Sequence, residues 1–223
     1  MFRSLRADEL FVQVLQSLMD RLSLDPARVD DVYLGCVGQH LEQGKNLARL
    51  SWLLAGFPDT VPGMTLNRLC ASSFSAVQVA ADAIGCGRLH CVIAGGVEHM
   101  THVPMTAALD YHPDLFRDAR FLWNNMGLTA EFLAKERQIS REEQDRFTQE
   151  SNRRYFQALE AGFYKGEIVP IATPEGRQDR DQQPRLSSLE ALAGLQPVFK
   201  EGGTVTAANS SGLGDGAAAL VVA

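Results

Sequence analysis

Short apolar runs alternate with helical patterns through the first hundred residues, and this alternation constrains the fold more than any other feature of the chain. Three runs have the length of buried strands: DVYLGCVG (31–38), GMTLN (63–67) and HCVIAGG (90–96). Three segments have the apolar spacing or the small residues of packed helices: 8–22, 46–56 and 70–84. Alternating strands and helices favour a parallel sheet with helices on its faces, so we predict an α/β fold.

The middle of the chain has a different character. From residue 97 to residue 202 charged residues are more frequent and β-like runs are rare. Helices are expected at 127–138 and 140–163, and the second begins with Ser140 and Glu143 at the spacing of a capping box. We therefore predict an inserted, mainly helical domain over residues 97–202.

Small and β-branched residues return in GTVTAANSSGLGDGAAALVVA (203–223), which should rejoin the sheet. The core domain is therefore predicted to comprise residues 1–96 and 203–223. A second capping-box spacing, Ser187 and Glu190, predicts a short helix ahead of this return. The polar run at 176–185 is expected to be an exposed loop.

Composition argues against several classes of protein. The 223 residues carry a formal net charge of −6 with scattered basic residues, so we expect no nucleic-acid partner. None of the four cysteines is in a CxxC spacing, which argues against a structural zinc site. The chain is too large and too rich in apolar residues to need disulfides, which indicates a reducing compartment, so we predict a cytoplasmic protein. No apolar run has the length or flanks of a signal peptide or a membrane span, and neither is expected.

One cysteine, Cys70 in NRLCASSF (67–74), stands where a thiol could act as a nucleophile. It falls in a tight connection between a predicted strand and a helix of small residues. The unpaired N–H groups and the dipole at a helix start favour a thiolate and could hold the oxyanion of a substrate carbonyl. Two interpretations remain open, a packing residue of the core and a nucleophile that forms an acyl-enzyme. The other three cysteines, at 36, 86 and 91, are predicted to be buried packing residues.

Four segments, in this order, resemble the thiolases, which interconvert 3-ketoacyl-CoA plus CoA with acyl-CoA plus acetyl-CoA. They are LNRLCASS (66–73), AGGVEHMTHVPM (94–105), MGLTAEFLAKERQISREEQD (126–145) and GTVTAANSSGLGDGAAALV (203–221). The resemblance spans essentially the whole chain. The second segment is most similar in sequence to the thiolase subunit of bacterial fatty-acid-oxidation complexes.

This resemblance implies the N-terminal half of a thiolase-like fold, in which a mixed, mostly parallel sheet has helices on both faces and carries an inserted helical loop domain. It implies that Cys70 is the acylated nucleophile and that Met126 lines the acyl pocket. The implied substrates are acyl-CoA and CoA, with no cofactor and no metal. A homodimer or larger assembly is implied as well, and membership of a fatty-acid-oxidation complex stays open.

The sequence also departs from the family's pattern. Thiolases carry an activating histidine in a Gly-His-Pro motif and a second cysteine in a Cys-x-Gly motif of their C-terminal half, and neither motif is matched here. The family's first core strand is also not matched. We therefore expect the chain to lack that strand and the C-terminal domain, and to be incomplete and inactive by itself.

Two alternatives belong to other classes. A ketoacyl-synthase-type condensing enzyme shares the fold and a nucleophilic cysteine. A degenerate, non-catalytic scaffold would bind acyl-CoA or a partner protein. His99 and His102 could suggest a metal site, but their spacing in a non-helical loop without a matching Asp or Cys predicts loop hydrogen bonding instead.

Overall fold

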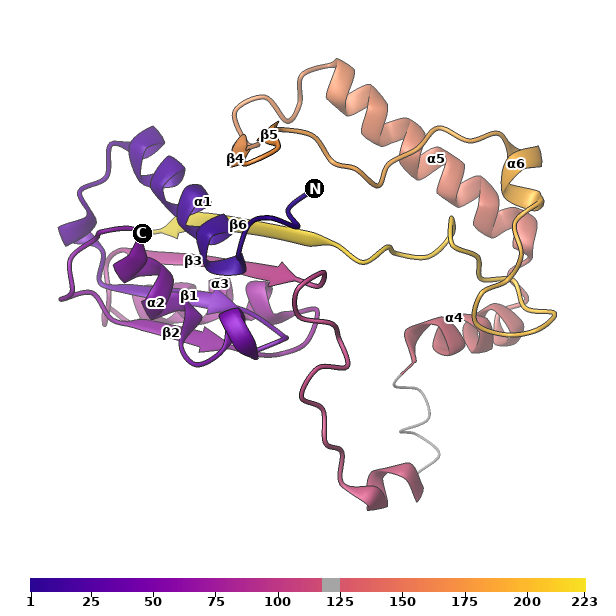
Figure 1. Ribbon diagram of the computed structural model, residues 1–223, viewed down its shortest axis with the longest axis horizontal. Helices are drawn as coiled ribbons and strands as arrows, with labels where there is room; N and C mark the ends of the chain where they lie inside the picture. Colours follow the sequence, from indigo (N-terminus) through magenta and orange to yellow (C-terminus); the bar gives the residue numbers. More distant parts are fainter. Residues whose placement is uncertain (118–124) are drawn as a thin grey trace. The chain divides into compact units, whose positions relative to one another are not determined.

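The computed structural model describes residues 1–117 and 125–223, which divide into two compact units (Figure 1). The first unit comprises Met1–Ala108, Val169–Arg180 and Leu213–Ala223, and the second comprises the described parts of Leu109–Ile168 and Asp181–Gly212. The domain limits predicted from composition, 1–96 plus 203–223 and 97–202, stay a prediction. No helix among the described residues is both long and apolar enough to cross a membrane.

A four-stranded sheet forms the centre of the first unit. Its strands are β1 (Asp31–Gly35), β2 (Gly63–Leu66), β3 (Val92–His99) and β6 (Asp215–Val222), in the order β2-β1-β3-β6. β1 runs parallel to both β2 and β3, and β6 pairs antiparallel with β3. The predicted α/β class and its mixed, mostly parallel sheet are therefore confirmed.

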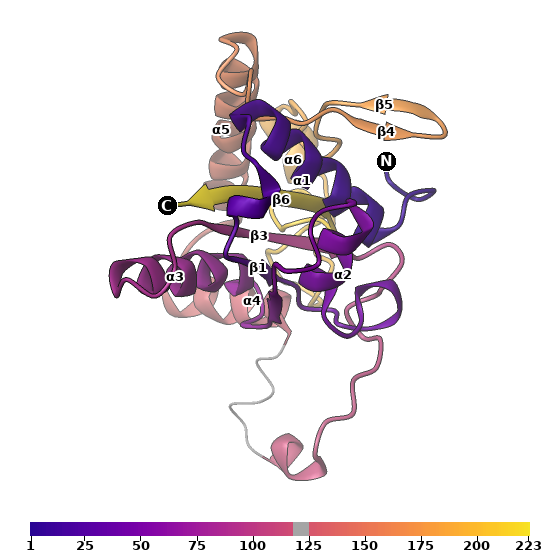
Figure 2. The ribbon, with the colours of Figure 1, turned by 90° about the vertical axis from the view of Figure 1, so that its left-hand side faces the viewer.

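Helices cover both faces of this sheet (Figure 2). They are α1 (Ala7–Leu22), α2 (Leu47–Leu54) and α3 (Ser72–Gly85), with the short 3₁₀ turns η1 (Pro26–Arg28) and η2 (Leu41–Gln43) between them. Successive strand residues face opposite sides. Val32 and Leu34 of β1 pack in the core formed with α1 and α2, whereas Tyr33 packs against Ala76 and Ala80 of α3.

The second unit is built on helices. They are α4 (Met126–Glu136), α5 (Arg141–Glu160) and α6 (Leu189–Ala193), together with the 3₁₀ turn η3 (Pro113–Arg117). The predicted capping box at the start of α5 is confirmed, because Ser140 Oγ accepts the Glu143 N–H and the Glu143 carboxylate accepts the Ser140 N–H. Glu131 of α4 is nearly buried and accepts the N–H groups of Thr204 and Val205, which fixes that returning segment to the helix.

Two local predictions were wrong. The N-cap of α6 is Ser188, whose hydroxyl accepts the Ala191 N–H, and not Ser187. The run at 176–185 does not begin as a loop, because β5 (Gly176–Gln178) pairs with β4 (Ile171–Thr173) in a hairpin. Gly176 has a φ of 118°, and this conformation, which glycine tolerates, allows the tight turn between the two strands.

Candidate active site

Cys70 lies in the turn between β2 and α3, one residue before the Ala71 N-cap of the helix. The parallel strands β1, β2 and β3 all end at this edge of the sheet, which is where open α/β sheets bind their ligands. The Cys70 side chain is exposed, so the interpretation as a core packing residue is wrong.

The other cysteines differ among themselves. Cys36 is buried, and burial together with the Glu98 charge raises the pKa of its thiol to about 12. Cys91 is partly buried, and burial raises the pKa of its thiol too. Cys86 is exposed at the C-terminal end of α3, so its prediction as a buried residue was wrong. The helix ends there and leaves the side chain in solvent.

The turn that carries Cys70 is strained and closely held. Leu69 has a φ of 50°, a left-handed conformation that costs an ordinary residue about 1–2 kcal/mol. Its N–H donates to Asn67 Oδ1 at 2.8 Å, and its carbonyl accepts the Ser72 hydroxyl at 2.6 Å. Ser72 Oγ also accepts the Arg68 N–H at 2.8 Å. Side chains from both sides of Cys70 therefore fix the backbone around it.

The start of α3 is pressed against the sheet. A Cβ atom built on Gly35 would lie 2.4 Å from the Ser73 backbone nitrogen, and one built on Gly96 would lie 1.8 Å from Ser73 Oγ. A side chain on Gly35, the last residue of β1, would clash with backbone atoms of α3, whereas one on Gly96, within β3, would clash with the Ser73 side chain. Ala71 forms no side-chain cap, so no side chain at the N-cap satisfies the first N–H groups of the helix. Such a helix start favours an anionic group beside it.

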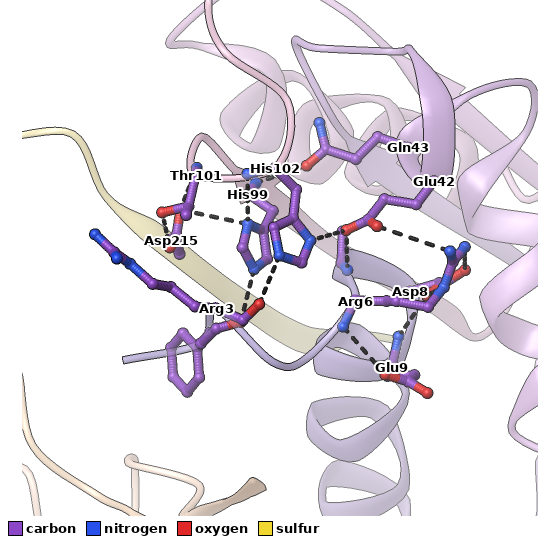
Figure 3. Close-up of polar contacts among 12 residues, drawn as sticks. Arg3, Arg6, Asp8, Glu9, Glu42, Gln43, His99, Thr101, His102 and Asp215 are labelled. Carbon is purple, nitrogen blue, oxygen red and sulfur yellow. Dashed lines mark hydrogen bonds and ion pairs between the residues drawn. The ribbon is translucent and has the colours of Figure 1, made fainter. Parts of the chain in front are cut away.

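A second polar cluster lies in the same unit, around His99 and His102 (Figure 3). The two rings are stacked with centroids 3.9 Å apart. His102 Nδ1 lies 2.9 Å from Glu42 Oε1, and its Nε2 lies 2.8 Å from the Arg3 carbonyl oxygen. Both partners are acceptors, so this geometry favours the doubly protonated ring of His102. The hydrogen bond to Glu42 raises the pKa of His102.

Buried His99 completes this cluster. Its Nε2 lies 3.0 Å from the Phe2 carbonyl oxygen, and its Nδ1 accepts the His102 N–H at 3.2 Å. The expected hydrogen-bonding role of the two histidines is therefore confirmed, with the N-terminal segment as their main partner.

Glu42 and the two histidines form a cluster of groups that could hold a metal ion. The sequence offered the histidines no acidic partner, but the structure brings Glu42 to them from η2, with one ligand atom from each of the three residues within 4.8 Å of one another. The ring nitrogens of both histidines already have hydrogen-bond partners in Glu42 and in backbone groups. The expected absence of a metal stays a prediction.

Met126, the second predicted site residue, is the first residue of α4 and is 71% exposed. It belongs to the second unit, whereas Cys70 belongs to the first. Sequence reasoning missed Asn67 and Ser72, which hold the turn. The glycines in two of the predicted strands, Gly35 and Gly96, were the sequence signal for the close packing of α3 on the sheet.

Comparison with known families agrees with this fold. A family model described as the thiolase N-terminal domain matches residues 1–223. This chain is a member of the thiolase family. Thiolase relatives include the 3-ketoacyl-CoA thiolases of Erwinia tasmaniensis, 46% identical, and Serratia proteamaculans, 45% identical, each aligned over 99% of this chain.

Among solved structures, the thiolase chain resembles the Bacillus anthracis acetyl-CoA acetyltransferase. That crystal structure matches with a TM-score of 0.83 and 37% sequence identity over 97% of this chain. The chain spans 59% of the length of that enzyme and 59% of the length of the two 3-ketoacyl-CoA thiolases. The thiolase-like fold predicted from the sequence is confirmed.

Proposed function

We propose that Cys70 is the nucleophile of a thiolase reaction, the thiolytic cleavage of 3-ketoacyl-CoA to acyl-CoA and acetyl-CoA or the reverse condensation. The observation that carries this proposal is an exposed thiol in a tightly held turn between a strand and an uncapped helix start. Family membership and relatives named 3-ketoacyl-CoA thiolase support the choice of reaction.

The reaction divides into two steps. The Cys70 thiolate attacks the 3-keto carbon, and the bond between that carbon and the neighbouring α-carbon breaks. The leaving acetyl-CoA enolate takes up a proton, and the acyl group stays on Cys70 as a thioester. The thiol of free CoA then attacks this thioester, which releases acyl-CoA and restores the Cys70 thiol.

Other groups have supporting roles in this proposal. The uncapped start of α3 would stabilise negative charge on the carbonyl oxygen that Cys70 attacks. Met126 would line the acyl pocket, and CoA is a substrate, with no cofactor required. His99 and His102 already bind backbone carbonyls and Glu42, so neither suits the role of base for Cys70. The uncapped helix start would allow the first acylation of Cys70, whereas we expect complete turnover to need the base and the proton donor that the family carries in its C-terminal half.

Assembly and compartment belong to the same proposal. Leu69 and Phe74 flank Cys70 and are 66% and 65% exposed, and such apolar side chains suit a contact with a second copy of the chain. We propose a homodimer or larger assembly in the cytoplasm, with a fatty-acid-oxidation complex as its setting.

Two alternatives make different predictions. A ketoacyl-synthase-type enzyme would also acylate its cysteine, but the named relatives favour a thiolase. A non-catalytic scaffold would bind acyl-CoA through an inert Cys70, so the reactivity of this thiol decides between a scaffold and an enzyme.

The test is the intact mass of the folded chain after incubation with acetyl-CoA. The thiolase proposal predicts the gain of one acetyl group in the wild type and none in Cys70→Ser. Circular dichroism would show that both proteins are folded. A folded wild type without an adduct would contradict the proposal, as would equal acetylation of Cys70→Ser.

A further inference from the structure

Both ends of the Asn67 carboxamide are engaged in holding the turn before Cys70. Its Oδ1 accepts the Leu69 N–H at 2.8 Å, and its Nδ2 donates to the Val37 carbonyl at 3.0 Å. The first bond closes a turn over Arg68, and its donor is the N–H of Leu69, the residue with the strained backbone. The second bond ties that turn to the loop that follows β1. No other side chain described in 1–117 and 125–223 hydrogen-bonds to both of these backbone groups.

The loop that receives Asn67 is itself well anchored. The Glu98 carboxylate accepts the N–H groups of Val37 at 2.8 Å and Gly38 at 3.1 Å. Gln43 is fully buried, donates to Glu98 Oε1 at 2.8 Å and accepts the His99 N–H at 2.6 Å. The loop that carries the Val37 carbonyl is therefore held to the end of β3. Because Asn67 bonds both to this carbonyl and to the Leu69 N–H, it holds the turn before Cys70 in a fixed position relative to that loop.

From this geometry we infer that Asn67 is a positioning residue for Cys70, an inference that rests on the proposed function. Attack on a thioester needs the sulfur, the carbonyl carbon and the oxyanion donors in one arrangement, and a displacement of about 1 Å can cost about 100-fold in rate. Alkylation by a small reagent needs only an accessible thiol. Loss of Asn67 should therefore slow the first reaction far more than the second.

The experiment compares two rates at Cys70 in the full chain, acetylation by acetyl-CoA and alkylation by iodoacetamide. For Asn67→Ala we expect acetylation at least about tenfold slower, equal to about 1.4 kcal/mol, and alkylation within about threefold of the wild type. Asn67 is exposed, so this variant leaves no cavity in the core. Asn67→Ser keeps a hydroxyl acceptor near Leu69 and should recover part of the loss.

The matched control is Asn152→Ala in α5. Asn152 also uses both ends of its carboxamide on backbone groups, accepting the Arg185 N–H and donating to the Thr148 carbonyl, each at 2.9 Å. It lies in the second unit and should leave both rates at Cys70 unchanged.

Each outcome decides the inference. A fall in acetylation alone supports the positioning role. Unchanged acetylation, or equal falls in both rates, overturns it while leaving the nucleophile in place. A wild type that is alkylated at Cys70 but never acetylated refutes the proposed function itself, and the role of Asn67 in it falls for that separate reason.

Discussion

Replacing Gly35 by alanine tests how the sheet sets the position of the turn that carries Cys70. The added Cβ would lie 2.4 Å from the Ser73 nitrogen, 2.5 Å from the Ser72 carbonyl carbon and 2.8 Å from Ser73 Cα. All three are backbone atoms of α3, so no side-chain rotation relieves the clash. The start of the helix has to move away from β1.

The size of that movement follows from the same contacts. Ordinary van der Waals contact begins at 3.4 Å, so the helix start must shift by about 1 Å from its contact at 2.4 Å. Overpacking of this kind costs about 1–3 kcal/mol of unfolding free energy. A shift of about 1 Å next to a nucleophile costs about 100-fold in rate. The variant should be folded, less stable and far slower in acetylation.

The assay is urea unfolding together with the rate at which acetyl-CoA acetylates Cys70. The control is Gly216→Ala in β6, where an added Cβ meets nothing within 4 Å. We expect Gly216→Ala to match the wild type in both measurements. If acetyl-CoA acetylated Cys70 in Gly35→Ala at the wild-type rate, the reasoning that contact between β1 and α3 positions the turn would be refuted.

Three further measurements test other parts of the structure. Because the folded pKa of His102 is raised, its contact with Glu42 stabilises the protein fully below about pH 6.5 and is lost as the pH rises through the folded pKa. The stability difference between wild type and His102→Gln, measured by urea unfolding, should therefore be larger at about pH 5 than at about pH 9, and equal differences would contradict this. Ser140→Ala removes the N-cap of α5 and should cost about 1 kcal/mol, seen as a lower urea midpoint, so an unchanged midpoint would count against the capping box. Cys36 is buried with a thiol pKa of about 12, so iodoacetamide at about pH 8 should label it far more slowly than Cys70 in the native protein. Equal labelling rates would contradict the burial of Cys36.

Local sequence patterns were enough to predict most helices and strands of the fold. The apolar spacing at 8–22 corresponds to α1, and the three apolar runs correspond to β1, β2 and β3. These elements were predictable because side-chain periodicity reports directly which face of a helix or strand is buried. The capping spacing of Ser140 and Glu143 was equally informative, since it depends on residues within one helical turn.

Contacts between distant parts of the chain could not be predicted in this way. Glu42 reaches His102 from a short 3₁₀ turn 60 residues away, and Asn67 reaches Val37 across 30 residues. No local periodicity encodes such pairs. Gly35 likewise shows only as a strand-end glycine in the sequence, and its contact with Ser73 depends on how closely the helix packs. Cys70 could be proposed as the nucleophile from the sequence because its turn, its helix and its family motif are contiguous in sequence.

The central claim is that the turn at the start of α3 makes Cys70 selectively reactive towards a thioester. Cys86 is an internal control, because it is also exposed but lies at the opposite end of the same helix. The most direct measurement is peptide mapping after treatment with acetyl-CoA or with iodoacetamide. Iodoacetamide should label both cysteines, whereas acetyl-CoA should acetylate Cys70 and spare Cys86. Acetylation of the two thiols in the same ratio as alkylation, or of neither, would contradict the claim.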